Sequence, residues 1–217
     1  MLRRNKYLIS LAKKMPNKNF WITPFMKKYY QEYLDKKLTD SMEKFDYIGF
    51  KLALCLGANP NIDAKIKKGY HLVTRCARSG DVDLLKLLLD FGGDINGGEE
   101  VGGYLPIHMA ATKGHPQILE LLINYGSNVH SLYQLRDEYS NIMEGRAWTP
   151  LICACQQNKT EAVDMLLNLG ANHLDKNDLN VSALDIATKH KNREMVQRIF
   201  NCYKEKPVTP RGKQPVV

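Results

Sequence analysis

Residues 105–126 read LPIHMAATKGHPQILELLINYG, and this stretch decides the fold. Pro106 suits the first turn of a helix, because the N–H that proline lacks is not needed there. The Gly-His-Pro break at residues 114–116 separates a short first helix from a second one, in which Ile and Leu recur at three- and four-residue spacing. Gly126 ends the second helix, since glycine adopts the left-handed turn that closes many helices. The stretch predicts a helix–turn–helix unit.

The same pattern recurs along the chain. Residues 71–92 and 149–170 align with residues 105–126 without gaps, and each copy ends on a glycine. A fourth copy begins at Ser182 and a degenerate first copy at Lys36. The two-helix part keeps its length while the connections vary, as expected when helix pairs stack in register and loops project into solvent. Because neither helix of a unit could bury its apolar face alone, the units must stack into one core.

These units resemble the ankyrin repeat, which has a period of about 33 residues and the pattern T-P-L-H-x-A. Residues 105–110 read LPIHMA and residues 149–154 read TPLICA, and the resemblance extends over residues 36–203. Other residues replace Thr-Pro in the copies that start at His71 and Ser182. The resemblance implies an all-α ankyrin-repeat solenoid of about five helix–turn–helix units with an N-terminal helical extension.

Basic residues gather at the two ends of the chain, whose formal net charge is +8. Residues 1–31 hold eight basic residues and no acid, whereas residues 32–187 have a net charge of −6 and residues 188–217 one of +6. Composition changes along with charge, because the last residues contain three prolines and no apolar periodicity. The expected parts are a basic and aromatic helical extension or cap over residues 1–35, an ankyrin-repeat domain over residues 36–205, and a flexible tail over residues 206–217.

The N-terminal extension has two interpretations. The apolar face of its first helix is formed by Leu8, Leu11, Ala12 and Met15. Thr23-Pro24 then reads as an N-cap followed by proline at the first helical position of a second helix. The aromatic residues of this second helix either cover the exposed end of the first repeat or, together with the basic residues, form a surface for a membrane or nucleic acid. The capping interpretation is favoured.

The sequence lacks the patterns of an enzyme, a metal site or a transmembrane protein. No stretch approaches eighteen consecutive apolar residues, and no Walker loop, zinc-protease motif or EF-hand loop occurs. Cys153 and Cys155 fall at core positions of a first helix, so they are interpreted as buried thiols rather than as a metal or redox pair. The resemblance implies that His108 hydrogen-bonds between loops rather than acting as a base. We expect no enzymatic activity, no catalytic residue, no metal and no cofactor.

The resemblance further implies that a partner binds the concave side, which is built from loop tips and first helices. Three sets of positions carry over by register: those before the Thr-Pro position, those that end the first helix, and those before the loop glycine. The candidate partner-binding residues at these positions are Tyr70, Tyr104, Trp148, Val181, Lys67, Lys68, Arg78, Lys113, Arg146, Gln156, Gln157 and Lys189. Tyr and Trp are enriched at binding hot spots. Cations outnumber acids at these positions, which predicts a groove for an acidic or phosphorylated segment.

An insertion of eleven residues lengthens the connection over residues 127–148, SNVHSLYQLRDEYSNIMEGRAW. The segment is too apolar for a passive loop, and long ordered loops are often functional. Two interpretations remain open. The insertion is either a local mini-helix packed on its neighbours or a partner contact through Tyr133 and Tyr139.

The sequence therefore predicts a non-enzymatic adaptor that binds a segment of another protein on its concave face. The alternative is a scaffold tethered to a membrane or to nucleic acid through residues 1–35. The five cysteines show no zinc spacing and are interpreted as reduced thiols, so we expect a cytoplasmic protein. The resemblance and the lysine- and asparagine-rich composition are also compatible with a host-directed bacterial or viral protein, which would act in the host cytosol.

Overall fold

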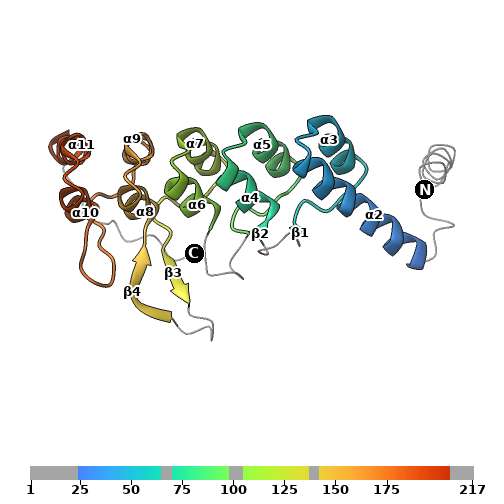
Figure 1. Ribbon diagram of the computed structural model, residues 1–217, viewed down its shortest axis with the longest axis horizontal. Coiled ribbons are helices and arrows are strands. Elements are labelled where there is room, and N and C mark those ends of the chain that lie inside the picture. The colour runs from blue at the N-terminus through green and yellow to red at the C-terminus, as the bar shows by residue number, and fades with distance from the viewer. Residues whose placement is uncertain (1–23, 65–69, 98–104, 137–141, 206–217) are drawn as a thin grey trace, which may run out of the picture. The chain divides into compact units, whose positions relative to one another are not determined.

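The computed structural model describes four stretches of the chain: residues 24–64, 70–97, 105–136 and 142–205. The chain forms two compact units, Met1–Asn59 and Pro60–Val217. Helix pairs are the building blocks of both units (Figure 1). The predictions of a first helix before residue 16 and of a flexible tail over residues 206–217 lie outside the described residues.

The first unit holds α2 (Pro24–Glu43) and α3 (Tyr47–Cys55), which pack against each other. α2 begins at the predicted proline and continues past residue 35, because no glycine or proline interrupts it. The second helix of the N-terminal extension and the first helix of the degenerate repeat are thus one continuous helix. Asp46 caps α3, where its carboxylate accepts a hydrogen bond of 2.9 Å from the backbone N–H of Gly49.

The second unit holds four helix pairs that stand side by side in two layers (Figure 1). The first helices are α4 (Leu72–Ser79), α6 (Pro106–Lys113), α8 (Pro150–Gln156) and α10 (Ala183–Lys189). The second helices are α5 (Val82–Asp90), α7 (Pro116–Asn124), α9 (Thr160–Asn168) and α11 (Arg193–Glu205). Each first helix packs on the neighbouring first helices, and each second helix packs on the neighbouring second helices. Together with α2 and α3, the described residues form five helix pairs, which confirms the predicted all-α repeat fold.

Small side chains allow the first helices to approach one another closely. One register position of these helices is held by Cys76, Ala110, Ala154 and Ala187, each at most 1% exposed. Leucine and isoleucine side chains of the second helices, such as Leu85, Ile118 and Leu166, are fully buried. Removing this apolar surface from water stabilises the stack of helix pairs, and close packing makes it specific.

Every helix pair turns through a residue in the left-handed conformation. The φ angle is positive at the same register position of all five pairs: 55° at Phe45, 80° at Gly80, 81° at Gly114, 56° at Asn158 and 56° at Lys191. A residue with a Cβ costs roughly 1–2 kcal/mol in this conformation. The turn is therefore imposed by the packing of the two helices, and copies that lack the glycine keep the fold.

The inserted segment is a β-hairpin and not a mini-helix. β3 (Tyr133–Arg136) pairs with β4 (Ile142–Trp148) in antiparallel orientation. The alternation of apolar and polar residues in Tyr-Gln-Leu-Arg has the two-residue period of a strand, and this is the signal that favours the observed structure. A shorter antiparallel pair joins β1 (Asp63–Ala64) to β2 (Tyr70–His71).

Candidate functional site

Five of the predicted partner-binding residues whose side chains the structure describes lie at the ends of the first helices, namely Arg78, Lys113, Gln156, Gln157 and Lys189. The two register positions that close α4, α6, α8 and α10 hold Arg78-Ser79, Thr112-Lys113, Gln156-Gln157 and Lys189-His190. None of these residues is an acid, and all except Thr112 and Gln156 are exposed. Because the four helices are neighbours, their ends form a row, which we call the basic row (Figure 1).

Basic residues at the end of a helix also complement the helix dipole, a surface effect of about 0.3–1 kcal/mol. The dipole accounts for Arg78, Lys113 and Lys189 in the last turns of their helices. It does not account for the absence of acids from the row itself. Within the part of the chain that the structure describes, Lys113 and Lys189 form no ion pair. Their ammonium groups are therefore accessible to an anionic partner.

Trp148 is a predicted aromatic anchor whose side chain the structure describes. It ends β4 directly before Thr149, which caps α8 by accepting a hydrogen bond of 3.3 Å from the backbone N–H of Ile152. The indole is partly buried, and its Nε1–H has no hydrogen-bond partner among the described residues. Val181 stands at the equivalent place before Ser182 and is also partly buried.

The other predicted partner-binding residues are described less completely. The structure describes the backbone, but not the side chains, of Tyr70 in β2, Tyr133 in β3 and Arg146 in β4. Four further residues lie outside the described residues, namely Lys67, Lys68, Tyr104 and Tyr139. The predicted row of three aromatic anchors therefore stays a prediction, except for the place of Trp148.

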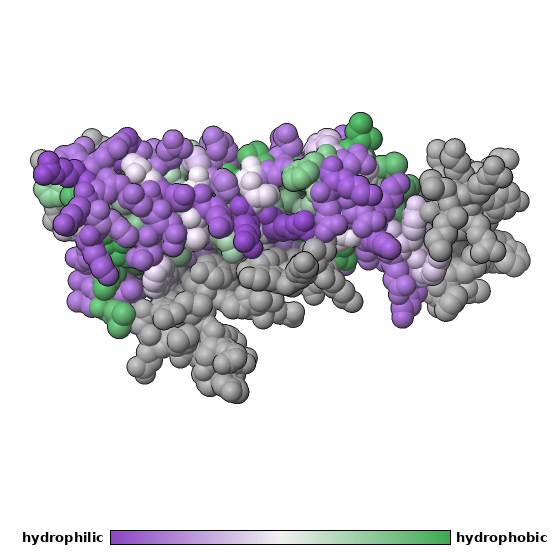
Figure 2. All heavy atoms as spheres, viewed as in Figure 1, coloured by the Kyte–Doolittle hydropathy of each residue, from purple (hydrophilic) through white to green (hydrophobic). Residues whose placement is uncertain are grey.

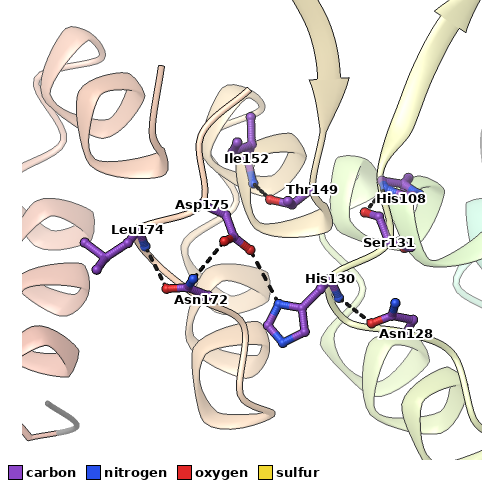
Figure 3. Close-up of polar contacts among 9 residues, drawn as sticks. All are labelled: His108, Asn128, His130, Ser131, Thr149, Ile152, Asn172, Leu174 and Asp175. Carbon is purple, nitrogen blue, oxygen red and sulfur yellow. Dashed lines mark hydrogen bonds and ion pairs between the residues drawn. The ribbon is translucent and has the colours of Figure 1, made fainter. Parts of the chain in front are cut away.

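His108 connects α6 to both ends of the insertion. Its side chain is fully buried, and its Nε2 lies 3.0 Å from the carbonyl oxygen of Ser131 (Figure 3). The same Nε2 lies 3.1 Å from the carbonyl oxygen of Trp148. Two carbonyl acceptors require that Nε2 carries the proton and donates it. Burial lowers the pKa of His108 to about 4, so the ring is neutral at neutral pH. Its hydrogen bonds to two loops agree with the structural role that the resemblance implied.

The loops of the second unit share one turn in register. The turns are closed by the side-chain oxygens of Asp94, Asn128 and Asn172, which accept hydrogen bonds of 2.9–3.0 Å from the backbone N–H groups of Asn96, His130 and Leu174. Figure 3 shows the turns of Asn128 and Asn172. An ion pair of 3.5 Å between His130 Nδ1 and Asp175 Oδ2 links two successive loops when the histidine is protonated. These contacts fix the loop conformations, and a preorganised surface loses less entropy when it binds.

Three leucines on the loops of the second unit are exposed. Leu132, Leu174 and Leu179 have relative exposures of 55%, 47% and 66%. Leu132 lies in the insertion, whose apolar character the sequence shows, and Leu179 lies in the connection just before Ser182. Leu174 was missed by sequence reasoning. The signal for Leu174 is an apolar residue in an otherwise polar loop, where no helical spacing calls for it. The exposed leucines add apolar contact surface to the loop tips.

Cys153 and Cys155 are packing residues of α8, as the sequence predicted. Both are buried, and burial raises the pKa of each thiol to about 12, so both are protonated at neutral pH. Among the described residues, no group of three or more His, Cys, Asp or Glu side chains is placed to hold a metal ion. Of the helices that the structure describes, none combines the length and the apolar character needed to cross a membrane.

Comparison with known proteins identifies the repeated unit. A family model of ankyrin repeats in three copies matches residues 46–133 and 129–209. The chain belongs to the ankyrin-repeat family. Ankyrin-repeat domains are generally non-catalytic. Ankyrin repeats form protein–protein interaction modules, so the chain is an interaction module, as the sequence predicted.

This ankyrin-repeat protein matches only part of each of its relatives. It is 32% identical over 123 residues to ankyrin repeat and SOCS box protein 5 of Oryctolagus cuniculus, and the matched region covers 47% of the chain and 36% of that protein. It is 30% identical over 137 residues to the probable E3 ubiquitin-protein ligase XBOS32 of Oryza sativa subsp. japonica, which covers 62% of the chain and 25% of that protein. The chain thus spans about a third of the first relative and a quarter of the second.

A third relative bears on catalysis. The chain is 38% identical over 58 residues to the 2-5A-dependent ribonuclease of Homo sapiens, which covers 27% of the chain and 8% of that protein. This match runs through the ankyrin repeats of the ribonuclease and carries no catalytic residue to the chain. The relatives named here come from animals and a plant, and none supports the bacterial or viral origin that composition suggested.

Proposed function

We propose that this ankyrin-repeat protein is an adaptor that binds an acidic or phosphorylated segment of another protein. The segment would lie along the basic row and the adjoining loop tips, which correspond to the concave side of ankyrin-repeat domains. The observation that carries the proposal is that the basic row holds exposed basic and amide side chains and no carboxylate. Residues 32–187 have a net charge of −6, so the lack of acids in the row is a local feature. Lysine ammonium groups form short, charge-assisted hydrogen bonds with carboxylates and phosphates.

The chemistry of the other residues refines the expected segment. Gln157 is exposed at the end of α8 and offers both a donor and an acceptor, which suits the backbone of an extended peptide. The exposed Leu174 and Leu179 favour a segment that carries apolar side chains beside its acids. We therefore propose a partner segment in which carboxylates or phosphates alternate with apolar anchors.

A peptide array tests this function with the full chain. The array presents short synthetic peptides in matched acidic, phosphoserine-containing, neutral and basic series. Wild-type protein should retain the acidic and phosphoserine series, and Lys113→Glu/Lys189→Glu should lose about tenfold or more in affinity. The matched control is Lys86→Glu/Arg193→Glu, which makes the same charge change at exposed positions of α5 and α11. This control should bind as the wild type does.

Other outcomes of the array are equally informative. Equal retention of the neutral series would contradict a preference for acids, and full binding by the Lys113→Glu/Lys189→Glu variant would place the site elsewhere. The alternative function depends on residues 1–35, most of which lie outside the described residues. If anionic vesicles or oligonucleotides bind the full chain but not a chain that lacks residues 1–35, and no peptide binds either form, the tethered scaffold is the better description.

We place this adaptor in the cytoplasm as part of the same proposal. All five cysteines are free thiols, and Cys76, Cys153 and Cys155 are buried as packing residues. Unpaired cysteines in a core are typical of proteins from reducing compartments. Fractionation of cells that express the tagged chain tests the location. Recovery in the secreted fraction with oxidised cysteines would contradict it.

A further inference from the structure

Helix α3 is apolar on two opposite faces. Its sequence, YIGFKLALC, contains a single charged residue, Lys51. One face includes Phe50 and Ala53, which are fully buried where α3 packs with α2. The opposite face holds Ile48 and Leu52, whose side chains are 79% and 47% exposed. A helix that is apolar all round is normally covered all round, so α3 has an unpartnered face.

The repeat pattern does not require this exposed face. The register position of Ile48 is held in the other helix pairs by Asp83, Gln117, Glu161 and Glu194, all of them polar and exposed. Leu56 follows Leu52 at the next four-residue step and is 42% exposed, and Phe45, in the turn before α3, is 80% exposed. We call Phe45, Ile48, Leu52 and Leu56 the α3 patch. Figure 2 shows apolar side chains at the surface over α3, whereas most of the described surface in that view is hydrophilic.

The size of the α3 patch indicates which kind of partner covers it. A contiguous exposed apolar patch marks a binding surface. A stable complex between two separate proteins uses roughly 20–30 residues on each side, many more than the patch offers. A segment of the same chain needs far less contact, because a short connection gives it an effective concentration in the millimolar range. The patch therefore fits a segment of its own chain better than a second copy.

The N-terminal segment is long enough to reach the patch. Gln31 Nε2 donates a hydrogen bond of 3.0 Å to the carbonyl of Gly57, so the end of α3 lies beside Gln31 and not beside the start of α2. The seven residues from Pro24 to Gln31 correspond to ~10 Å along the helix. Residues 16–23 can span up to ~26 Å when extended, which is enough to return to α3 and run along it.

We infer that residues 1–15 cover the α3 patch and act as a built-in cap of the first unit. The segment would use the apolar face that its sequence pattern provides, formed by Leu8, Leu11, Ala12 and Met15. Lys6, Lys13 and Lys14 fall outside this face and stay in solvent, whereas Arg4 lies one turn before Leu8, at the N-terminal end of the face. The inference does not depend on the proposed adaptor function, because the α3 patch belongs to the first unit and the basic row to the second.

Cys55 provides a native probe of this cap. It lies three residues after Leu52 and seven after Ile48, so it stands on the same face of α3, and it is exposed among the described residues. The rate at which a maleimide labels Cys55 can be measured by mass spectrometry in the full chain and in a chain that lacks residues 1–15. A cap that is docked in about nine of ten molecules should make labelling about tenfold faster on truncation. Cys202, which is partly buried in α11, is the internal control and should label at the same rate in both chains.

Substitutions in the full chain separate docking from any effect of truncation on folding. Leu11→Glu places a charge on the apolar face and should reproduce the faster labelling of Cys55. Ser10→Glu adds the same charge on the opposite face and should leave the rate unchanged. Equal Cys55 rates in wild type, truncated chain and Leu11→Glu would overturn the inference. Protection that weakens on dilution of the full chain would also overturn it, because a second copy would then be the cover.

Discussion

The imidazole Nε2 of His108 lies 3.1 Å from the carbonyl oxygen of Trp148, which follows it by forty residues in the chain. The same nitrogen lies 3.0 Å from the carbonyl oxygen of Ser131. Ser131 precedes β3 and Trp148 ends β4, so one buried side chain holds both ends of the inserted hairpin. The hairpin is thereby tied to the core of the repeat and is not a freely hinged appendage.

His108 should make the stability of the second unit depend on pH. Burial lowers its pKa from 6.5 to about 4, so between these values the unfolded chain binds the proton more strongly than the folded chain. The contribution of neutral His108 to the unfolding free energy is therefore fully present above pH 6.5 and is lost as the pH falls toward about 4. Its size is roughly 3 kcal/mol, since each pH unit of difference corresponds to about 1.4 kcal/mol. Urea unfolding across this window measures the loss.

Substitution of His108 provides the matched test. His108→Asn removes the titrating group and leaves buried carbonyls without their donor, so its unfolding free energy at neutral pH should be lower by about 1–3 kcal/mol. The variant should also lose the pH dependence assigned to His108. His190→Asn, at an exposed position after α10, should behave as the wild type does. A full pH dependence that survives in His108→Asn would show that another group is responsible.

The repeated helix pairs were predictable from the sequence because their signals are local. Apolar spacing, an N-terminal proline and a closing glycine all lie within one unit, and Pro106 and Gly114 stand in the structure where the sequence put the start and the end of α6. The basic row was predictable for the same reason, since register carries its positions from one copy to the next. The hairpin was not, because β3 and β4 depend on pairing between separate segments.

The exposure of apolar residues was not predictable, because neighbours and not local pattern decide burial. Leu52 and Leu87 occupy the same register position of α3 and α5, yet Leu52 is 47% exposed and Leu87 only 7%. Sequence periodicity assigns both to an apolar face and cannot tell whether another element covers it. The α3 patch and Leu174 became visible for this reason only with the structure.

Gly80 should tolerate alanine less well than Gly92 does. Both glycines have positive φ angles, 80° and 85°, so both substitutions strain the backbone. A Cβ on Gly80 would lie 2.8 Å from the imidazole of His115, whose Nε2 is held 3.1 Å from the carbonyl of Arg78, whereas a Cβ on Gly92 would meet no atom within 4 Å. We expect Gly80→Ala to lower the unfolding free energy by about 1 kcal/mol more than Gly92→Ala.

Chemical denaturation of the two glycine variants measures this difference. Gly80→Ala/His115→Ala removes the ring that the new methyl group would strike and should recover part of the difference. If Gly80→Ala and Gly92→Ala are equally destabilised, the contact with His115 has no energetic weight and backbone strain alone explains both.

The start of α10 should depend on its capping box. Ser182 accepts a hydrogen bond from the backbone N–H of Asp185, and the carboxylate of Asp185 accepts one of 2.8 Å from the backbone N–H of Ser182. The backbone N–H and the hydroxyl of Ser182 both donate to this carboxylate and hold the pKa of Asp185 below its usual value, so its contribution is present at neutral pH and is lost in acid. Ser182→Ala should lower the unfolding free energy by about 1 kcal/mol. Ser79→Ala, outside any N-cap, should change it by less, and an equal loss would contradict the role of the cap.

The loop leucines should contribute to binding without contributing to stability. Leu174 is 47% exposed, so Leu174→Ser removes little buried surface and should leave the unfolding curve unchanged. If the loop tips contact the apolar side chains of a partner segment, the same variant should weaken the best peptide of the array, as fluorescence anisotropy measures. Leu52→Ser is the matched control, because Leu52 has the same exposure but lies on α3, away from the basic row in the chain. A loss of affinity in both variants, or in neither, would separate peptide binding from the loop tips and leave the basic row as the sole contact.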